Sequence, residues 1–221
     1  MRQLIVRAGS ACPLFKLAAF GLALALTFSC SSDKDDDKTP GGSPGTGGGE
    51  ASSQVYNYND GTPFTGSGVI KILVEKYRYD DLLINAGSVT NGIVNLQLPT
   101  TTIPDEYLDS YGVFATNRSH AYGHLILTNS NGERIGDLGI TSGRVGPGET
   151  EGIQYDYFSE AVKIDSTSTI APIIYDIDAK IGWNKIYTHV NLAADGTTVL
   201  SVKYSTNNIL TKPVKWFFAP N

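Results

Sequence analysis

The stretch Gly87-Ser88-Val89-Thr90-Asn91-Gly92-Ile93-Val94-Asn95-Leu96-Gln97-Leu98-Pro99 indicates the fold more clearly than any other part of the chain. From Val94 to Leu98 every second residue is apolar, which is the period of a half-buried β-strand. Asn91-Gly92 precedes this run, and the pair favours a tight hairpin turn because both residues tolerate positive φ. Pro99 ends the strand because it has no N–H for the ladder. The stretch therefore predicts two antiparallel strands joined at Asn91-Gly92.

Most of the remaining chain, from about residue 54 onward, shows the same period of two. The run Val69–Val74 is apolar on both faces and predicts a central strand. Only Pro104–Tyr111 favours a short helical turn, with Pro at its start and carboxylates in its first turn. Further strands are expected at Val113–Thr116, His124–Thr128, Ile153–Phe158, Val162–Ile164, Ile173–Asp178, Lys185–Val190, Val199–Tyr204 and Val214–Phe218. Eight or nine short strands predict an all-β fold, either a single antiparallel β-sandwich or an open barrel.

The N-terminal segment has the layout of a secretory signal. Arg2, Arg7 and Lys16 provide positive charge, and an apolar run follows from Leu17 to Leu26. The uncharged stretch is about a dozen residues long, whereas a membrane-spanning helix needs about 20. A signal peptide over residues 1–29 is therefore preferred to a retained transmembrane anchor.

Cys30 lies where the apolar run meets a polar acidic one, directly after the small residue Ser29. In this respect the segment resembles the lipobox of bacterial lipoproteins. It departs from that pattern at Phe28 and Thr27, since the lipobox prefers a small residue and Leu there. The resemblance implies removal of residues 1–29 and attachment of a diacylglycerol and a further acyl chain, such as palmitate, to Cys30. The alternative is an ordinary cleaved signal that leaves Cys30 as a lone thiol or removes it.

The number of cysteines favours lipid attachment. The chain has two cysteines, Cys12 and Cys30, and Cys12 lies in the segment that would be removed. The mature chain would then form no internal disulfide, and an exported protein needs a use for a single remaining thiol. Each buried methylene of an acyl chain contributes about 0.8 kcal/mol, so two or three chains anchor a protein stably.

The acidic run Ser31–Asp37 bears on the compartment. It resembles the acidic export tag that follows the lipidated cysteine in surface lipoproteins of the Bacteroidota. That resemblance implies the outer membrane, with the domain at the cell surface, although a periplasmic face stays open. The alternative is a solvated charge run that keeps the linker away from anionic lipid heads.

A flexible tether and one globular domain follow. Residues 30–53 comprise Cys30, the acidic run and a Gly/Ser/Pro-rich spacer, and residues 54–221 form the domain. The chain carries a net charge of −5, which argues against nucleic acid as a partner. Within the domain, Gly87–Pro99 and Ile181–Tyr187 resemble segments of uncharacterised β-rich lipoproteins of gut and rumen bacteria. This resemblance implies the same compartment and brings no catalytic residues.

Catalytic and metal-binding patterns are weak. His120 and His124 are four apart, which on a helix would put both on one face for a metal, but no Glu follows His120 as a zinc protease requires. Polar surface or turn histidines are the preferred interpretation, and a metal site is the alternative. Asp176 and Asp178 would share one strand face, as a glycosidase pair could, although a solvated strand face shows the same pattern. No nucleophile elbow is present. The sequence therefore predicts no catalytic residue, no metal and no cofactor.

The aromatic residues are the remaining candidates for a binding site. Tyr155 and Tyr157 share a strand face and, with Trp183, could stack on sugar rings. The alternative is that tyrosines fill sheet faces because of their high β-propensity, and that Trp183 and Trp216 anchor the core or plug an end of the sandwich. The leading interpretation is a membrane-anchored lipoprotein whose domain is a non-enzymatic module for binding, adhesion or assembly, with a polysaccharide or protein as ligand. The alternative function is a carbohydrate-binding or carbohydrate-processing accessory.

Overall fold

The computed structural model describes residues 52–75, 81–109, 119–143, 146–167 and 172–221, which all belong to one compact unit. Within these residues the only helix is the 3₁₀ turn Asp105–Tyr107, and no helix is long and apolar enough to cross a membrane. The strands are β1 (Ser52–Asn57), β2 (Gly68–Val74), β3 (Leu82–Thr90), β4 (Ile93–Leu96), β5 (His120–Thr128), β6 (Arg134–Thr141), β7 (Gly148–Phe158), β8 (Val162–Thr167), β9 (Ile173–Ala179), β10 (Gly182–Leu192), β11 (Val199–Ser205) and β12 (Lys215–Pro220).

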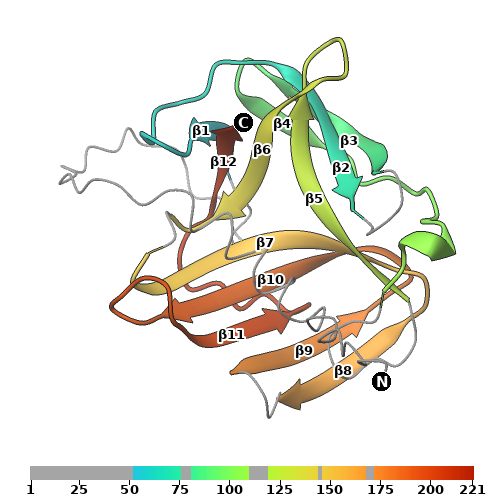
Figure 1. The fold of residues 1–221 in the computed structure, drawn as a ribbon, viewed down its shortest axis with the longest axis vertical. Helices are drawn as coiled ribbons and strands as arrows, with labels where there is room; N and C mark the ends of the chain where they lie inside the picture. Colours follow the sequence, from blue (N-terminus) through green and yellow to red (C-terminus); the bar gives the residue numbers. More distant parts are fainter. Residues whose placement is uncertain (1–51, 76–80, 110–118, 144–145, 168–171) are drawn as a thin grey trace, which may run out of the picture. The chain divides into compact units, whose positions relative to one another are not determined.

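Eight of these strands close into a barrel (Figure 1). Their order around the barrel is β12-β1-β4-β3-β2-β5-β7-β6, and β6 pairs with β12 to complete the circle. Strand β5 is shared at the closure, because its first half pairs with β7 and its second half with β6. The barrel is mixed, since β1 runs parallel to β12 and antiparallel to its other neighbour, β4.

The predicted hairpin is confirmed as β3 and β4. Asn91 and Gly92 both have positive φ, 51° and 77°, as the tight turn requires. The turn is also tied to β1, because the Val55 N–H donates to the Gly92 carbonyl at 2.8 Å, and to the β1–β2 connection, because the Gly92 N–H donates to the Gly66 carbonyl at 2.9 Å. The hairpin therefore helps to close the barrel at a point where β1 and β4 are paired at only one register position, Gln54 with Ile93.

The barrel interior is a packed apolar core. Alternate residues of each strand point inward, so Ile70, Ile72 and Val74 of β2 are all buried. Trp216 and Phe218 of β12 enter the same core, which confirms the prediction that Trp216 is a core residue. Residues of the β4–β5 connection, Ile103 and Leu108, are 1% and 2% exposed and also belong to this core.

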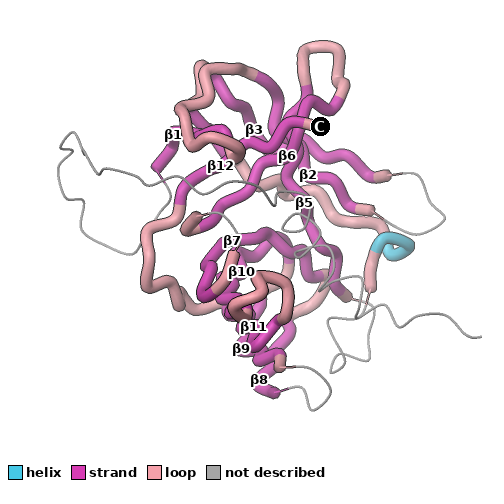
Figure 2. Tube along the Cα trace, turned by 60° about the vertical axis from the view of Figure 1, so that its left-hand side comes forward, coloured by secondary structure: helices cyan, strands magenta, loops and turns pink. Residues whose placement is uncertain are grey.

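The other four strands extend the sheet beyond β7 in the order β10-β11-β9-β8, and we call them the second lobe. Figure 2 shows these strands continuing away from the barrel. Strand β9 alternates strictly, with Ile173, Tyr175 and Ile177 buried in a second apolar core. Strand β7 contributes to both cores, because Tyr157 faces the barrel interior and its neighbour Phe158 faces the second lobe.

The all-β class is confirmed, but the expected antiparallel sandwich or open barrel of eight or nine strands is only partly right. The barrel is closed, two strand pairs are parallel, and the sheet has twelve strands within the described residues. Strand β6 was not predicted, because Gly136 and Gly139 interrupt its apolar pattern. A Cβ at Gly136 would lie 2.3 Å from the Ala219 carbonyl oxygen, so the close approach of β12 requires glycine there. The expected strand Val113–Thr116 lies outside the described residues.

Candidate functional site

The aromatic residues proposed for ligand binding come together, but as packing. Tyr155 and Tyr157 do share one face of β7, and they are only 5% and 4% exposed within the barrel core. Trp183 of β10 is half-buried, and its ring lies edge-on to Tyr157 with the centroids 5.6 Å apart. These tyrosines fill a sheet face, as the alternative interpretation holds, and they present no exposed row of rings.

Gly123 provides the room for Trp183. A Cβ at this position would lie 2.5 Å from a ring carbon of Trp183 and 2.6 Å from the Tyr155 carbonyl oxygen. Strand β5 therefore needs glycine at position 123, because a side chain there would displace the Trp183 indole.

The histidines form part of a polar row on the outer face of β5. His120, Tyr122 and His124 are two residues apart, so their side chains lie on the face of β5 opposite the barrel core. The expectation of polar surface histidines is wrong, because His120 is 2% exposed and the His124 side chain 14% exposed. A spacing of four puts two side chains on one face of a helix, and in a strand the same spacing also puts them on one face.

One end of the row is a buried histidine–carboxylate pair. The His120 Nε2 lies 3.1 Å from the Asp156 Oδ2, and Asp156 is fully buried. Gln154 donates from its side-chain amide to both carboxylate oxygens at 3.1 Å. This arrangement links β5 to β7 between the two cores, and its burial keeps a substrate in solvent away from both groups. The pair is thus suited to holding strands together.

Two tyrosines share this environment with Asp156. Burial raises the pKa of Tyr122, and the charges of Asp156, Glu75 and Asp137 raise it further. Burial also raises the pKa of Tyr204, with additional contributions from Tyr175, Tyr122 and Asp156. Both phenols therefore stay neutral at physiological pH.

The other end of the row is an ion-pair cluster nearer the surface. The His124 Nε2 lies 3.3 Å from the Asp137 Oδ1, and the Arg134 Nε donates to the same oxygen at 3.0 Å. Burial alone raises the pKa of Asp137, but hydrogen bonds and charge from His124 and Arg134 outweigh burial and lower it. Asp137 is therefore a carboxylate held by two basic groups. Within the described residues, no group of three or more His, Cys, Asp or Glu could hold a metal ion.

Asp156→Ala is expected to lower the free energy of unfolding by about 2 to 3 kcal/mol. The substitution removes the carboxylate that faces the buried His120 and that accepts from the half-buried Gln154, and unmet buried polar groups are costly. Asp178→Ala is the matched control, since Asp178 is exposed on β9 and should change stability by less than about 0.5 kcal/mol. Urea unfolding followed by tryptophan fluorescence measures both, and equal effects would contradict the role given to the pair.

Asp176 and Asp178 share the outer face of β9, as predicted. Asp176 accepts a hydrogen bond from the Ser205 hydroxyl at 2.9 Å, and the Lys203 Nζ lies 4.0 Å away. The backbone N–H of Asp178 donates to the Thr206 hydroxyl at 2.9 Å. These contacts join β9 to the end of β11.

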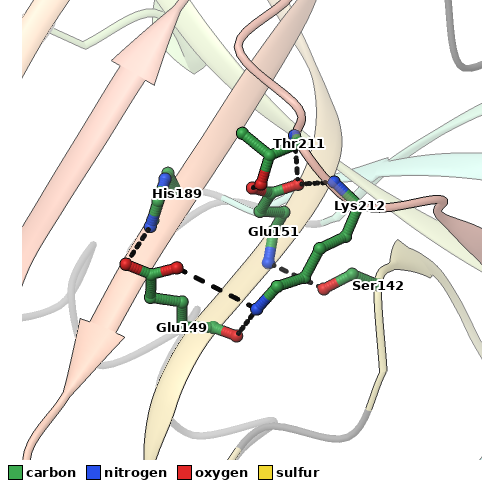
Figure 3. Close-up of polar contacts among 6 residues, drawn as sticks. All are labelled: Ser142, Glu149, Glu151, His189, Thr211 and Lys212. Atoms are coloured by element: carbon green, nitrogen blue, oxygen red, sulfur yellow. Dashed lines mark hydrogen bonds and ion pairs between the residues drawn. The ribbon is translucent and has the colours of Figure 1, made fainter.

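A second carboxylate cluster, which the sequence does not predict, lies at the other end of β7 (Figure 3). Glu151 is 1% exposed and accepts three hydrogen bonds: from the Thr211 hydroxyl at 2.6 Å, the Thr211 N–H at 2.8 Å and the Lys212 N–H at 2.9 Å. Burial alone raises the pKa of Glu151, but these bonds and the charge of His189 outweigh burial and lower it. Glu151 thus fastens the β11–β12 connection to the barrel.

The outer part of this cluster is exposed. Glu149 lies 3.7 Å from the His189 Nε2, and its backbone carbonyl accepts from the Lys212 Nζ at 3.1 Å. The Ser142 hydroxyl accepts from the Glu151 N–H at 3.0 Å. No local pattern could have identified the cluster, because Glu151 and Thr211 are 60 residues apart in the sequence.

No family model matches this chain, and neither a curated protein nor a solved structure is significantly similar to it. The structure therefore defines the fold class of this protein, which is all-β with a closed mixed barrel and a sheet extension.

Proposed function

We propose that this protein is a bacterial lipoprotein whose mature chain begins at a lipidated Cys30. The observation that carries the proposal is the position of Cys30, between an uncharged apolar run and the acidic stretch Ser31–Asp37. After removal of residues 1–29, Cys30 is also the sole cysteine. Attachment of the diacylglycerol would therefore occupy the only thiol of an exported chain. The acyl chains would hold the domain at the outer membrane, at the cell surface if the acidic run acts as an export tag.

For the domain itself, we propose a non-enzymatic module for binding, adhesion or assembly. The geometry that supports this is the use of its buried carboxylates. Asp156 joins β5 to β7, and Glu151 fastens a loop to the barrel, so both are committed to structural contacts. A carbohydrate-binding accessory is the second function that the sequence suggests. It would need exposed ring faces for sugars to stack on, and Tyr155 and Tyr157 are buried.

The tether supports display of the domain away from a membrane. Strand β1 begins at Ser52, so the Gly-rich spacer reaches almost to the sheet. A Gly-rich coil of about 20 residues spans roughly 25 Å. This length would lift the barrel clear of the lipid headgroups.

Cys30→Ala is expected to move the protein from the membrane fraction to the soluble fraction. The reason is that the substitution removes the only attachment point for acyl chains, and no residue type other than cysteine forms the thioether. Fractionation of cells followed by immunoblotting measures the change. Cys12→Ala is the matched control, because Cys12 lies in the segment that is removed, and this variant should stay with the membrane. A Cys30→Ala protein that fractionates like the wild type would contradict the proposal.

A further inference from the structure

Strand β8 lies at the end of the twelve-stranded sheet. Within the described residues it pairs with β9 alone, and the other strands of the sheet each have at least two partners (Figure 1). An edge strand directs alternate N–H and C=O groups outward, where another strand can pair with them. The outer edge of β8 is therefore a place where the sheet can be continued.

The side chains of β8 alternate between the two faces of the sheet. Ile164 is 8% exposed and belongs to the second core, whereas Lys163 and Asp165 on either side of it are exposed. An antiparallel pairing of two β8 strands centred on Ile164 places Lys163 of each copy opposite Asp165 of the other. The same pairing keeps both Ile164 side chains on the core face, because opposite residues in a ladder share a face.

Other registers are less favourable. A pairing centred on Lys163 puts two lysines opposite each other, and one centred on Asp165 does the same with two aspartates, which is destabilising. A slip of one residue would bring a charged side chain to the core face. The sequence of β8 is thus complementary to itself in the register centred on Ile164.

The neighbouring strand adds a reason for a positive charge beside Asp165. In the β8–β9 ladder Asp165 lies opposite Asp176, a pair of like charges, while Lys163 lies opposite Asp178. Asp176 has Lys203 and Ser205 as neighbours. A lysine from a second copy would offset the repulsion that Asp165 experiences on its other side.

We propose that two copies of this chain associate through β8, in antiparallel register about Ile164, so that the sheet of one second lobe continues into that of the other. Charged residues normally discourage pairing at a sheet edge. In β8 they favour a second copy as the partner, because Lys163 and Asp165 of one antiparallel strand face Asp165 and Lys163 of the other. This association goes beyond the lipid anchor and does not depend on it.

Sedimentation velocity of the full chain, with detergent micelles in excess over protein, tests the proposal. The wild type should show a reversible monomer–dimer equilibrium. Lys163→Glu and Asp165→Lys should each weaken dimerisation about tenfold or more, because each turns two attractive cross-strand pairs into two repulsive ones. Lys180→Glu is the matched control: it makes the same charge change at an exposed site outside β8 and should dimerise like the wild type.

Mixing the two β8 variants gives the decisive result. The introduced glutamate then faces the introduced lysine, and Asp165 of one chain faces Lys163 of the other, so the mixture should form heterodimers although each variant alone dimerises weakly. Thermal unfolding verifies that each variant is folded. A monomeric wild type, a dimer that neither variant weakens, or a mixture that stays monomeric would each overturn the proposal. Pairing of β8 with an extended segment of another protein would appear as a monomeric wild type.

Discussion

Gly92→Ala is expected to lower the free energy of unfolding by about 3 kcal/mol, among the largest effects of a single methyl group in this protein. Two costs add at this position. The φ of 77° disfavours any residue with a Cβ, and that Cβ would lie 1.8 Å from the Phe64 carbonyl oxygen. Backbone would have to move, and Gly92 is where the hairpin turn bonds to both Val55 and Gly66. The substitution therefore weakens the closure of the barrel between β1 and β4.

Gly61→Ala separates the two costs. Gly61 has a similar φ of 71°, but a Cβ there would meet nothing within 4 Å. This variant should lose only the conformational cost, about 1 kcal/mol. Chemical denaturation of both variants and the wild type gives the difference. If the two substitutions cost the same, the close packing of the hairpin turn against residue 64 does not contribute to stability.

Glu151→Gln is expected to destabilise the protein by about 2 kcal/mol at pH 7. The carboxylate accepts three hydrogen bonds while buried, and an uncharged amide of the same size satisfies them less well. The variant should also loosen the β11–β12 connection, since Leu210 and Val214 on either side of Thr211 pack against the barrel core. Faster hydrogen exchange at the amides of Thr211 and Lys212 would report this directly.

The effect of Glu151→Gln should depend on pH in a defined direction. The pKa of Glu151 is lower in the folded chain than its ordinary value of 4.5, so its contribution is complete above that value and is lost as the pH falls through the folded pKa. The stability gap between wild type and variant should therefore shrink from pH 7 to pH 3. Glu149→Gln is the control, because Glu149 is half-exposed and its ion pairs contribute less than about 0.5 kcal/mol. A gap that is constant with pH would show that Glu151 acts through shape rather than charge.

Local patterns predicted the strands well where one face of a strand is apolar. The hairpin at Asn91-Gly92, the central strand β2 and the alternating strand β9 all follow from residue type and spacing. The closure of the barrel could not be predicted in this way. It depends on the parallel pairing of β1 with β12, segments at opposite ends of the domain, and on Gly136, which β6 needs for the close approach of β12 rather than for a turn.

The candidate sites show the same limit. Residue type correctly placed Tyr155 and Tyr157 on one face, but period two cannot say whether that face meets solvent or a core. The two apolar cores cover the two faces of β7, so this strand is buried on both sides although it carries polar residues such as Asp156. His120, which faces Asp156, and Thr211, which donates to Glu151, come from distant parts of the chain, and no spacing in the sequence indicates these pairs.

The central proposal, a lipid-anchored mature chain, is tested most directly by mass spectrometry of the N-terminal peptide of protein isolated from membranes. We expect a peptide that begins at Cys30 and carries a diacylglycerol thioether, with a further acyl chain on its amino group. The same preparation should contain no peptide from residues 1–29. A mature chain that begins elsewhere, or an unmodified Cys30 thiol in the membrane-bound protein, would contradict the proposal.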